Sequence, residues 1–92
     1  MSVIKVKSVA RVALYTTPNC GYCTLLKRLI RGKSVAFEEV DVSSDFAKRR
    51  WLAAQTGRRT VPQLFIDDRP VGGYTDVVAL DRSGELDRLL AS

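Results

Sequence analysis

The stretch TTPNCGYCTLLKRLI, residues 16–30, contains both cysteines of the chain and predicts the start of a helix. Apolar residues at positions 22, 25, 26, 29 and 30 follow the helical period, and Gly32 supplies a stop. The TPN tripeptide separates this helix from an apolar, partly β-branched run at residues 9–16, which predicts a buried strand. The two cysteines therefore lie three residues apart on the first turn of a helix that follows a strand.

The rest of the chain continues to alternate between strand and helix patterns. The predicted elements are a strand at 34–42, a helix capped by Ser43 or Ser44 that ends at Gly57, two strands joined by a tight turn at 63–67 and 68–73, and one or two short helices at 76–82 and 84–90. This order, β-α-β-α-β-β-α, predicts an α/β fold with a mixed four-stranded sheet covered by helices. Residues 3–7 alternate like an edge strand, and the pattern gives them no place in the sheet.

Length and charge narrow the class of protein. A chain of 92 residues predicts one small domain, residues 1–92, in which residues 1–8 form a short N-terminal extension. The net charge of +5 is spread among alternating acidic and basic residues, except at 48–50 and 58–59. Neither aromatic platforms nor a groove-reading motif accompany these clusters, so we expect no nucleic-acid partner. The first ten residues do not resemble a signal peptide, and no window approaches a membrane span, which favours the cytoplasm and no membrane partner.

Two structural roles for the cysteines fit poorly. A disulfide that closes so short a loop would contribute only about 2 kcal/mol, and a reducing cytosol would remove it. A structural zinc site needs four ligands from Cys and His, whereas the chain has two cysteines and no histidine. We therefore expect no metal site built by one chain.

A redox role fits the spacing better. Side chains at i and i+3 on a first helical turn lie about 5–6 Å apart at Cβ, close enough for a disulfide after a small adjustment. Cys20 is expected at the helix N-terminus, where free N–H groups and the helix dipole favour a thiolate. Cys23 lies one turn further, beside the apolar stripe, and should be more buried. This asymmetry makes Cys20 the attacking nucleophile and Cys23 the resolving thiol.

Three separated stretches resemble one family. They are YTTPNCGYC at 15–23, RRTVPQLFID at 58–67 and GGYTD at 72–76, and in this order and spacing they resemble the bacterial dithiol glutaredoxins. The resemblance runs from about Val9 to the C-terminus. It implies a thioredoxin-like three-layer sandwich and an oxidoreductase that uses glutathione as co-substrate to reduce protein disulfides and glutathione mixed disulfides. It also implies a monomer whose partners are glutathione and disulfide-bearing or glutathionylated proteins.

The resemblance also implies a set of glutathione-binding residues: Tyr22, Arg49, Arg59, Thr60, Val61, Pro62, Gly73, Thr75 and Asp76. In the family, a cis bond precedes the proline that matches Pro62, and the backbone of Val61 would pair with the cysteinyl backbone of glutathione. The Thr75 and Asp76 amides would hold the γ-glutamyl carboxylate, and the Asp76 side chain would take the ammonium group.

Arg49 and Arg59 match positions that often contact the glycyl carboxylate, and Tyr22 would face the substrate. Taken alone, each of these residues has a structural alternative. Pro62 could start an edge strand, Thr75 or Asp76 could cap a helix, the arginines could be solvated surface, and Tyr22 could be core.

Two residues depart from the family pattern, and two other functions stay open. Thr17 replaces a frequent lysine, and Gly21 replaces a frequent proline of the active-site turn. One alternative is a redoxin reduced by thioredoxin reductase, against which GGYTD argues. The other is a [2Fe-2S] cluster held by Cys20 from each of two chains together with two glutathione thiolates, which Gly21 makes conceivable.

Overall fold

The computed structural model describes residues 10–91. Its elements are β1 (Val12–Thr16), α1 (Gly21–Gly32), β2 (Glu38–Asp41), α2 (Phe46–Thr56), β3 (Gln63–Ile66), β4 (Arg69–Gly72), α3 (Tyr74–Ser83) and α4 (Glu85–Ala91). The predicted strand at residues 3–7, the extension at 1–8 and the predicted start of the first strand at Val9 lie outside the described residues.

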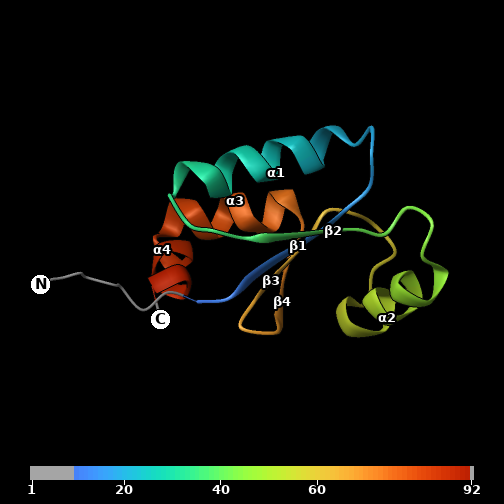
Figure 1. The fold of residues 1–92 in the computed structure, drawn as a ribbon. Coiled ribbons are helices and arrows are strands. Elements are labelled where there is room, and N and C mark those ends of the chain that lie inside the picture. The colour runs from blue at the N-terminus through green and yellow to red at the C-terminus, as the bar shows by residue number, and fades with distance from the viewer. Residues whose placement is uncertain (1–9, 92) are drawn as a thin grey trace, which may run out of the picture.

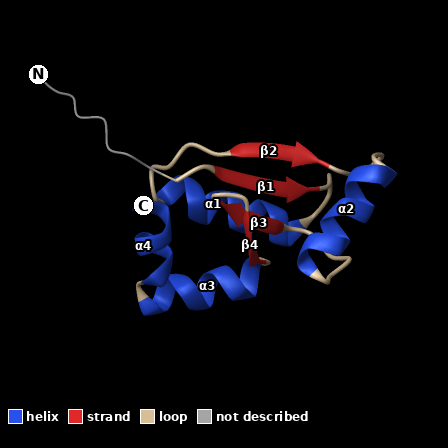
Figure 2. Cartoon of the chain, turned by 90° about the horizontal axis from the view of Figure 1, so that it is seen from below, coloured by secondary structure: helices blue, strands red, loops and turns tan. Residues whose placement is uncertain are grey.

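The four strands form one mixed sheet in the order β2-β1-β3-β4 (Figure 2). β1 is parallel to β2 and antiparallel to β3, and β3 is antiparallel to β4. The turn between β3 and β4 consists of Asp67 and Asp68, which both have positive φ, as a two-residue hairpin turn requires. The predicted α/β fold with a mixed four-stranded sheet is confirmed.

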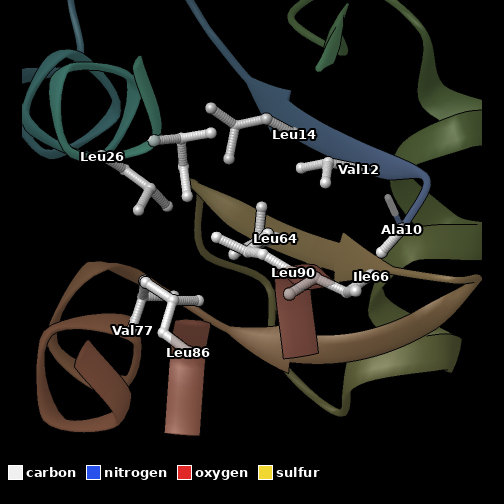
Figure 3. Packing of buried hydrophobic residues seen from close by; sticks show 10 residues of the cluster. Ala10, Val12, Leu14, Leu26, Leu64, Ile66, Val77, Leu86 and Leu90 are labelled. Carbon is white, nitrogen blue, oxygen red and sulfur yellow. The ribbon is translucent and has the colours of Figure 1, made fainter. Parts of the chain in front are cut away.

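Helices cover both faces of this sheet, which makes three layers. α1 and α3 lie on one face together with α4, and α2 lies apart from them (Figure 1). The main core fills the space between the sheet and α1, α3 and α4, where Leu14, Leu26, Leu64, Val77 and Leu86 have no exposed surface (Figure 3). On the opposite face α2 packs through an aromatic cluster, in which the Trp51 ring lies 5.6 Å from those of both Tyr15 and Phe65.

The buried face of α1 differs from the predicted stripe. Cys23, Leu26 and Ile30 are buried, whereas Tyr22 is 59% exposed and Leu25 36% exposed. The predicted spacing counted every apolar residue, but only one side of the helix meets the sheet. The alternative that Tyr22 belongs to the core is wrong.

The second helix begins later than the sequence predicted. Its cap is Asp45, which accepts a hydrogen bond from the N–H of Lys48 at 2.9 Å, and not Ser43 or Ser44. The reason is the preceding turn, since Val42 is fully buried and its N–H donates to the carbonyl of Thr16 at 2.9 Å. The chain must leave this anchor before a helix can start. The predicted end at Gly57 is confirmed, with φ of 74°.

Candidate active site

Both cysteines lie at the start of α1, and they form a disulfide with Cα atoms 5.2 Å apart. Cys20 is the N-cap residue, and its Sγ accepts a hydrogen bond from the N–H of Cys23 at 3.1 Å. The first turn of α1 contains no acidic side chain. The unpaired N–H groups and the positive end of the helix dipole therefore act on this sulfur with no opposing charge from that turn, and this favours its thiolate form.

The two sulfurs differ in access, as the sequence predicted. Cys23 is only 2% exposed and packs at the edge of the core, whereas Cys20 is partly exposed. A thiol that attacks an external disulfide must be reachable, and a thiol that attacks its neighbour need not be. The geometry therefore fits Cys20 as the attacking residue and Cys23 as the resolving one.

A loop before β3 approaches the disulfide from the other side. The Val61–Pro62 bond is cis, and the carbonyl oxygen of Val61 lies 4.0 Å from Cys20 Sγ. β3 starts at Gln63 and lies between two strands, so the alternative that Pro62 starts an edge strand is wrong.

A groove of about 270 Å³ runs along this loop. It is lined by Tyr22, Arg58, Thr60, Val61, Pro62, Gly73, Tyr74 and Thr75. Six of these eight are residues that the sequence predicted for glutathione binding. The exposed Tyr22 ring stacks on that of Tyr74 with centroids 5.7 Å apart, so the two rings form one wall of the groove.

Asp76, which the sequence also predicted for glutathione binding, does not line the groove itself but pairs with Arg58, which does. Its Oδ2 accepts hydrogen bonds from Arg58 Nη1 at 2.6 Å and from the N–H of Gly73 at 2.9 Å. The Arg58 guanidinium, and next the Gly73 N–H, hold the pKa of the Asp76 carboxyl below its usual range, and Asp76 in turn raises the pKa of Arg58. The carboxylate therefore stays charged at neutral pH and keeps the guanidinium at the groove.

The glycines before α3 make room for this arrangement. Gly72 has φ of 129°, and a Cβ placed there would lie 2.6 Å from both Cβ and Oδ2 of Asp76. A Cβ on Gly73 would lie 3.2 Å from the carbonyl oxygen of Pro62. Gly73 caps α3, so the alternative of Thr75 or Asp76 as cap is wrong, and Asp76 instead reaches back from the third helical position. α3 thus starts two residues before the predicted position.

The structure separates the other two predicted arginines from the groove. Arg49 and Arg59 line a different hollow of about 420 Å³ together with Phe46, Arg50 and Ala53. Arg59 nevertheless directly precedes Thr60, so the hollow and the groove are neighbours along the chain.

Sequence reasoning missed Arg58 and Tyr74 as groove residues. The sequence offered a signal for Tyr74, because this residue lies inside the GGYTD motif beside a predicted site residue. The choice between Arg58 and Arg59 could not be predicted, because adjacent residues of an irregular loop show no period that indicates which one faces the groove.

A smaller hollow on the far side of the disulfide includes Thr17, Lys27 and Glu39. Glu39 accepts hydrogen bonds from Thr16 Oγ1 at 2.8 Å and from Lys27 Nζ at 3.1 Å, and these two groups, Thr16 first, lower the pKa of its carboxyl. The charge of Lys27 is therefore offset locally. With Thr17 in place of a lysine, the helix terminus remains the main electropositive feature at Cys20.

Among residues 10–91 there is no group of three or more His, Cys, Asp and Glu side chains placed to hold a metal ion. Within the same range, no helix is both long and apolar enough to cross a membrane.

Comparison with known proteins gives a consistent result. The Glutaredoxin family model matches residues 12–71. Glutaredoxin 3 of Escherichia coli strain K12 is 44% identical over 82 residues, which cover 89% of this chain and 99% of that protein. The glutaredoxin of Pseudomonas aeruginosa is 42% identical over 81 residues, which cover 88% of this chain and 96% of the relative.

Solved structures agree with these sequence relatives. The solution structure of glutaredoxin from Brucella melitensis matches with a TM-score of 0.82 at 40% identity and covers 91% of both chains. The crystal structure of a buckwheat glutaredoxin–glutathione complex also matches with a TM-score of 0.82, at 27% identity, over 88% of this chain and 76% of that one.

Proposed function

The chain belongs to the glutaredoxin family and is an oxidoreductase of that type, and on this premise we propose that glutathione is its electron donor and that it reduces glutathione mixed disulfides and protein disulfides. The observation that carries the proposal is the Cys20–Cys23 disulfide at the N-terminus of α1, beside a groove with a stacked aromatic wall and the Arg58–Asp76 ion pair.

With a glutathione mixed disulfide, Cys20 acts alone. Its thiolate attacks the glutathione sulfur, a Cys20–glutathione disulfide forms, and the substrate leaves as a thiolate that takes a proton from water. The thiolate of a second glutathione then attacks the glutathione sulfur of this adduct, which releases oxidised glutathione and regenerates the Cys20 thiolate. One glutathione thiol is oxidised and one substrate thiol is released, and the other half of the oxidised glutathione comes from the mixed disulfide itself.

With a protein disulfide, both cysteines act. The Cys20 thiolate attacks one sulfur and frees the other as a thiolate. Cys23 loses its proton and attacks Cys20 Sγ, which forms the intramolecular disulfide and releases the second protein thiol. Two glutathione molecules then reduce the Cys20–Cys23 disulfide in two exchanges and leave as oxidised glutathione.

The groove supports specific glutathione contacts. The backbone of Val61 lies beside Cys20 and would pair with the cysteinyl residue, flanked by Thr60 and Pro62. The first amides of α3, those of Thr75 and Asp76 among them, have no acceptor within the helix and would hold the γ-glutamyl carboxylate.

The Arg58–Asp76 pair adds one charge of each sign at this end of the groove. A carboxylate has about four acceptor positions, so Asp76 can accept the γ-glutamyl ammonium as well as Gly73 and Arg58. Arg58 would face the carboxylate of the same zwitterion. Arg49 and Arg59 stay as proposed contacts of the glycyl carboxylate, although they line the neighbouring hollow.

Further proposals concern the state of the protein in the cell. We expect residues 1–92 to act as one glutaredoxin domain, with residues 1–8 as a short extension, and as a cytoplasmic monomer. A glutathione-ligated [2Fe-2S] cluster would need Cys20 from two chains, because one chain offers only two cysteines. Visible absorbance after anaerobic purification, together with a dimeric mass, would favour the cluster over the monomer.

The main test measures turnover of a glutathionylated peptide with glutathione, glutathione reductase and NADPH, and repeats it with thioredoxin reductase as the only electron source. Cys20→Ser should abolish all activity, because this thiolate starts every cycle. Cys23→Ser should keep turnover of the mixed disulfide and lose most reduction of protein disulfides. Turnover with thioredoxin reductase but not with glutathione would reject glutathione as the donor. Equal behaviour of the two variants would reject the division of roles between the cysteines.

A further inference from the structure

The hollow lined by Arg49 and Arg59 also contains residues that the proposed function does not use. We call the surface formed by Phe46, Arg49, Arg50, Ala53 and Arg59 the basic patch. We propose that the basic patch docks an acidic, apolar-containing segment of the protein substrate whose disulfide is reduced at Cys20. This inference rests on the proposed function, since it adds a second contact for the same protein substrate.

The arginines of the basic patch form no salt bridge among residues 10–91. The salt bridges of residues 10–91 include Arg11, Lys27, Lys33, Arg58 and Arg88 but none of the three patch arginines. α2 has no acidic residue within its bounds, and its remaining cation, Lys48, lies over the Trp51 ring at 4.9 Å. The basic patch therefore carries three positive charges that form no salt bridge within the described part of the chain. The glycyl carboxylate of glutathione would supply one negative charge and leave two of these three positive charges without a counterion.

The basic patch also presents an exposed aromatic ring. Phe46 is the first residue of α2 and is 78% exposed, although the other aromatic residues near α2 pack against one another. The Asp45 cap fixes where the helix begins and so fixes the position of Phe46. A large apolar side chain next to guanidinium groups, above a hollow of about 420 Å³, suits an apolar side chain flanked by carboxylates.

One residue of the basic patch is joined to the active site by a short stretch of chain. Arg59 directly precedes Thr60 and Val61, and the Val61 carbonyl lies 4.0 Å from Cys20 Sγ. A polypeptide whose cysteine is bonded to Cys20 can leave the groove along this loop, which leads to Arg59. A partner of this site must also carry a sulfur that exchanges. A protein does and a nucleic acid does not, which favours an acidic protein segment over another polyanion.

The test uses two glutathionylated peptides of equal length. One carries Asp, Glu and a single Leu beside its cysteine, and the other has Asn and Gln in place of the acids. A third substrate, the mixed disulfide of glutathione with 2-mercaptoethanol, reports basal activity. The variants are Arg50→Glu and Phe46→Ala, neither of which belongs to the proposed glutathione contacts. The matched control is Arg82→Glu, an exposed arginine at the end of α3 with the same change in net charge.

Arg50→Glu should lower kcat/KM for the acidic peptide by about 3- to 10-fold at low salt and by much less at about 0.5 M salt, because a charge at the edge of an interface acts mainly on association. Phe46→Ala should lower it about threefold at both salt concentrations. Both variants should leave the small mixed disulfide within about twofold of the wild type, as should Arg82→Glu with all three substrates. Arg50→Glu should also spare the amide peptide, whereas Phe46→Ala should weaken both peptides alike, because both keep the Leu.

Equal losses for the acidic and amide peptides in Arg50→Glu, no loss for either peptide in Phe46→Ala, or an equal loss in Arg82→Glu would overturn the docking surface. Fluorescence anisotropy of a labelled acidic peptide without cysteine measures docking independently of turnover. If the wild type fails to turn over the small mixed disulfide, the proposed function fails, and anisotropy still decides whether the basic patch binds the peptide. Tighter binding of a single-stranded DNA oligonucleotide of equal charge, lost in Arg50→Glu, would replace the acidic segment as partner.

Discussion

At the scale of single residues, Asp76 joins the start of α3 to the groove beside the cysteines. The same carboxylate oxygen accepts from the Gly73 N–H and from the Arg58 guanidinium. The first bond completes the N-terminus of α3 and the second holds the Arg58 side chain at the wall of the groove. A substitution at Asp76 therefore affects stability and recognition together, whereas one at Arg58 separates them.

Arg58→Gln should raise KM for glutathionylated substrates and leave the fold intact, because the Gly73–Asp76 hydrogen bond does not depend on Arg58. A lost charge-assisted contact at a half-exposed site should cost about 5- to 20-fold in kcat/KM. Arg58→Lys should recover part of this loss, since it restores the charge but not the fork of donors. Steady-state kinetics at several glutathione concentrations measures both variants. Unchanged kinetics in Arg58→Gln would show that the guanidinium does not face the substrate.

The Asp76 carboxylate also predicts a pH dependence of stability. Its pKa in the folded protein is lowered from the ordinary value of 3.8, mainly by Arg58 and then by Gly73. The carboxylate therefore contributes fully to the free energy of unfolding above this ordinary value and loses its contribution as the pH falls through the lower folded pKa. Between about pH 7 and pH 5 the difference in unfolding free energy between wild type and Asp76→Asn should be constant, and below about pH 4 it should shrink. Urea denaturation of both proteins measures it, and a difference that already shrinks near pH 6 would contradict the lowered pKa.

At the scale of elements, the sequence predicted whether a segment is a helix or a strand better than it predicted where that segment begins and ends. Hydrophobic periodicity identified β1, α1 and the β3–β4 hairpin, because each buries a face against the sheet. Helix starts depend on how the preceding turn is anchored, which local pattern does not contain. The predicted cap of the second helix was Ser43 or Ser44. In the structure, the chain is still anchored at the buried Val42, and the cap is Asp45.

The candidate site shows the same division between local and tertiary information. The cysteine roles followed from their places on one helical turn. The Arg58–Asp76 pair joins residues 18 positions apart, and nothing in either local sequence favours Arg58 over Arg59 for it. The motif resemblance supplied most residues of the groove because it carries tertiary information that periodicity lacks.

The junction between β4 and α3 offers a test of how tightly this part of the site is built. Gly72→Ala should destabilise the protein by about 2 kcal/mol or more, since its Cβ would meet Asp76 at 2.6 Å in a backbone conformation that favours glycine. Gly32→Ala is the matched control, because it stands at the end of α1 with nothing within 4 Å of its Cβ. It should be neutral or stabilise by up to about 1 kcal/mol. Chemical denaturation compares the two, and equal effects would show that Asp76 moves aside without cost.

At the scale of the whole molecule, the helices on the two faces of the sheet differ in how many buried side chains attach them to it. The main core fixes α1, α3 and α4 (Figure 3). α1 alone contributes Cys23, Leu26 and Ile30 to the buried residues. α2 contributes Leu52 as its one buried residue within the described chain, together with the half-exposed Trp51 ring. The basic patch thus lies mostly on the less firmly held layer, while the cysteines lie on the firmly held one. A docking surface can adapt to a partner, but a disulfide exchange site needs fixed geometry.

This inequality predicts separate opening of α2. Amide hydrogens of residues 46–56 should exchange with solvent faster than those of residues 23–32, because opening α2 exposes far less apolar surface than opening α1. Leu52→Ala should accelerate exchange in α2 by removing its buried anchor and leave exchange in α1 nearly unchanged at neutral pH. Hydrogen–deuterium exchange followed by mass spectrometry of peptic fragments measures both helices in one sample. Leu26→Ala is the matched comparison, since its side chain belongs to the main core and its loss should accelerate exchange in α1 as well as α2. If Leu52→Ala accelerated both helices equally, the two layers would open as one cooperative unit, and the adaptability of α2 would have no basis in its packing.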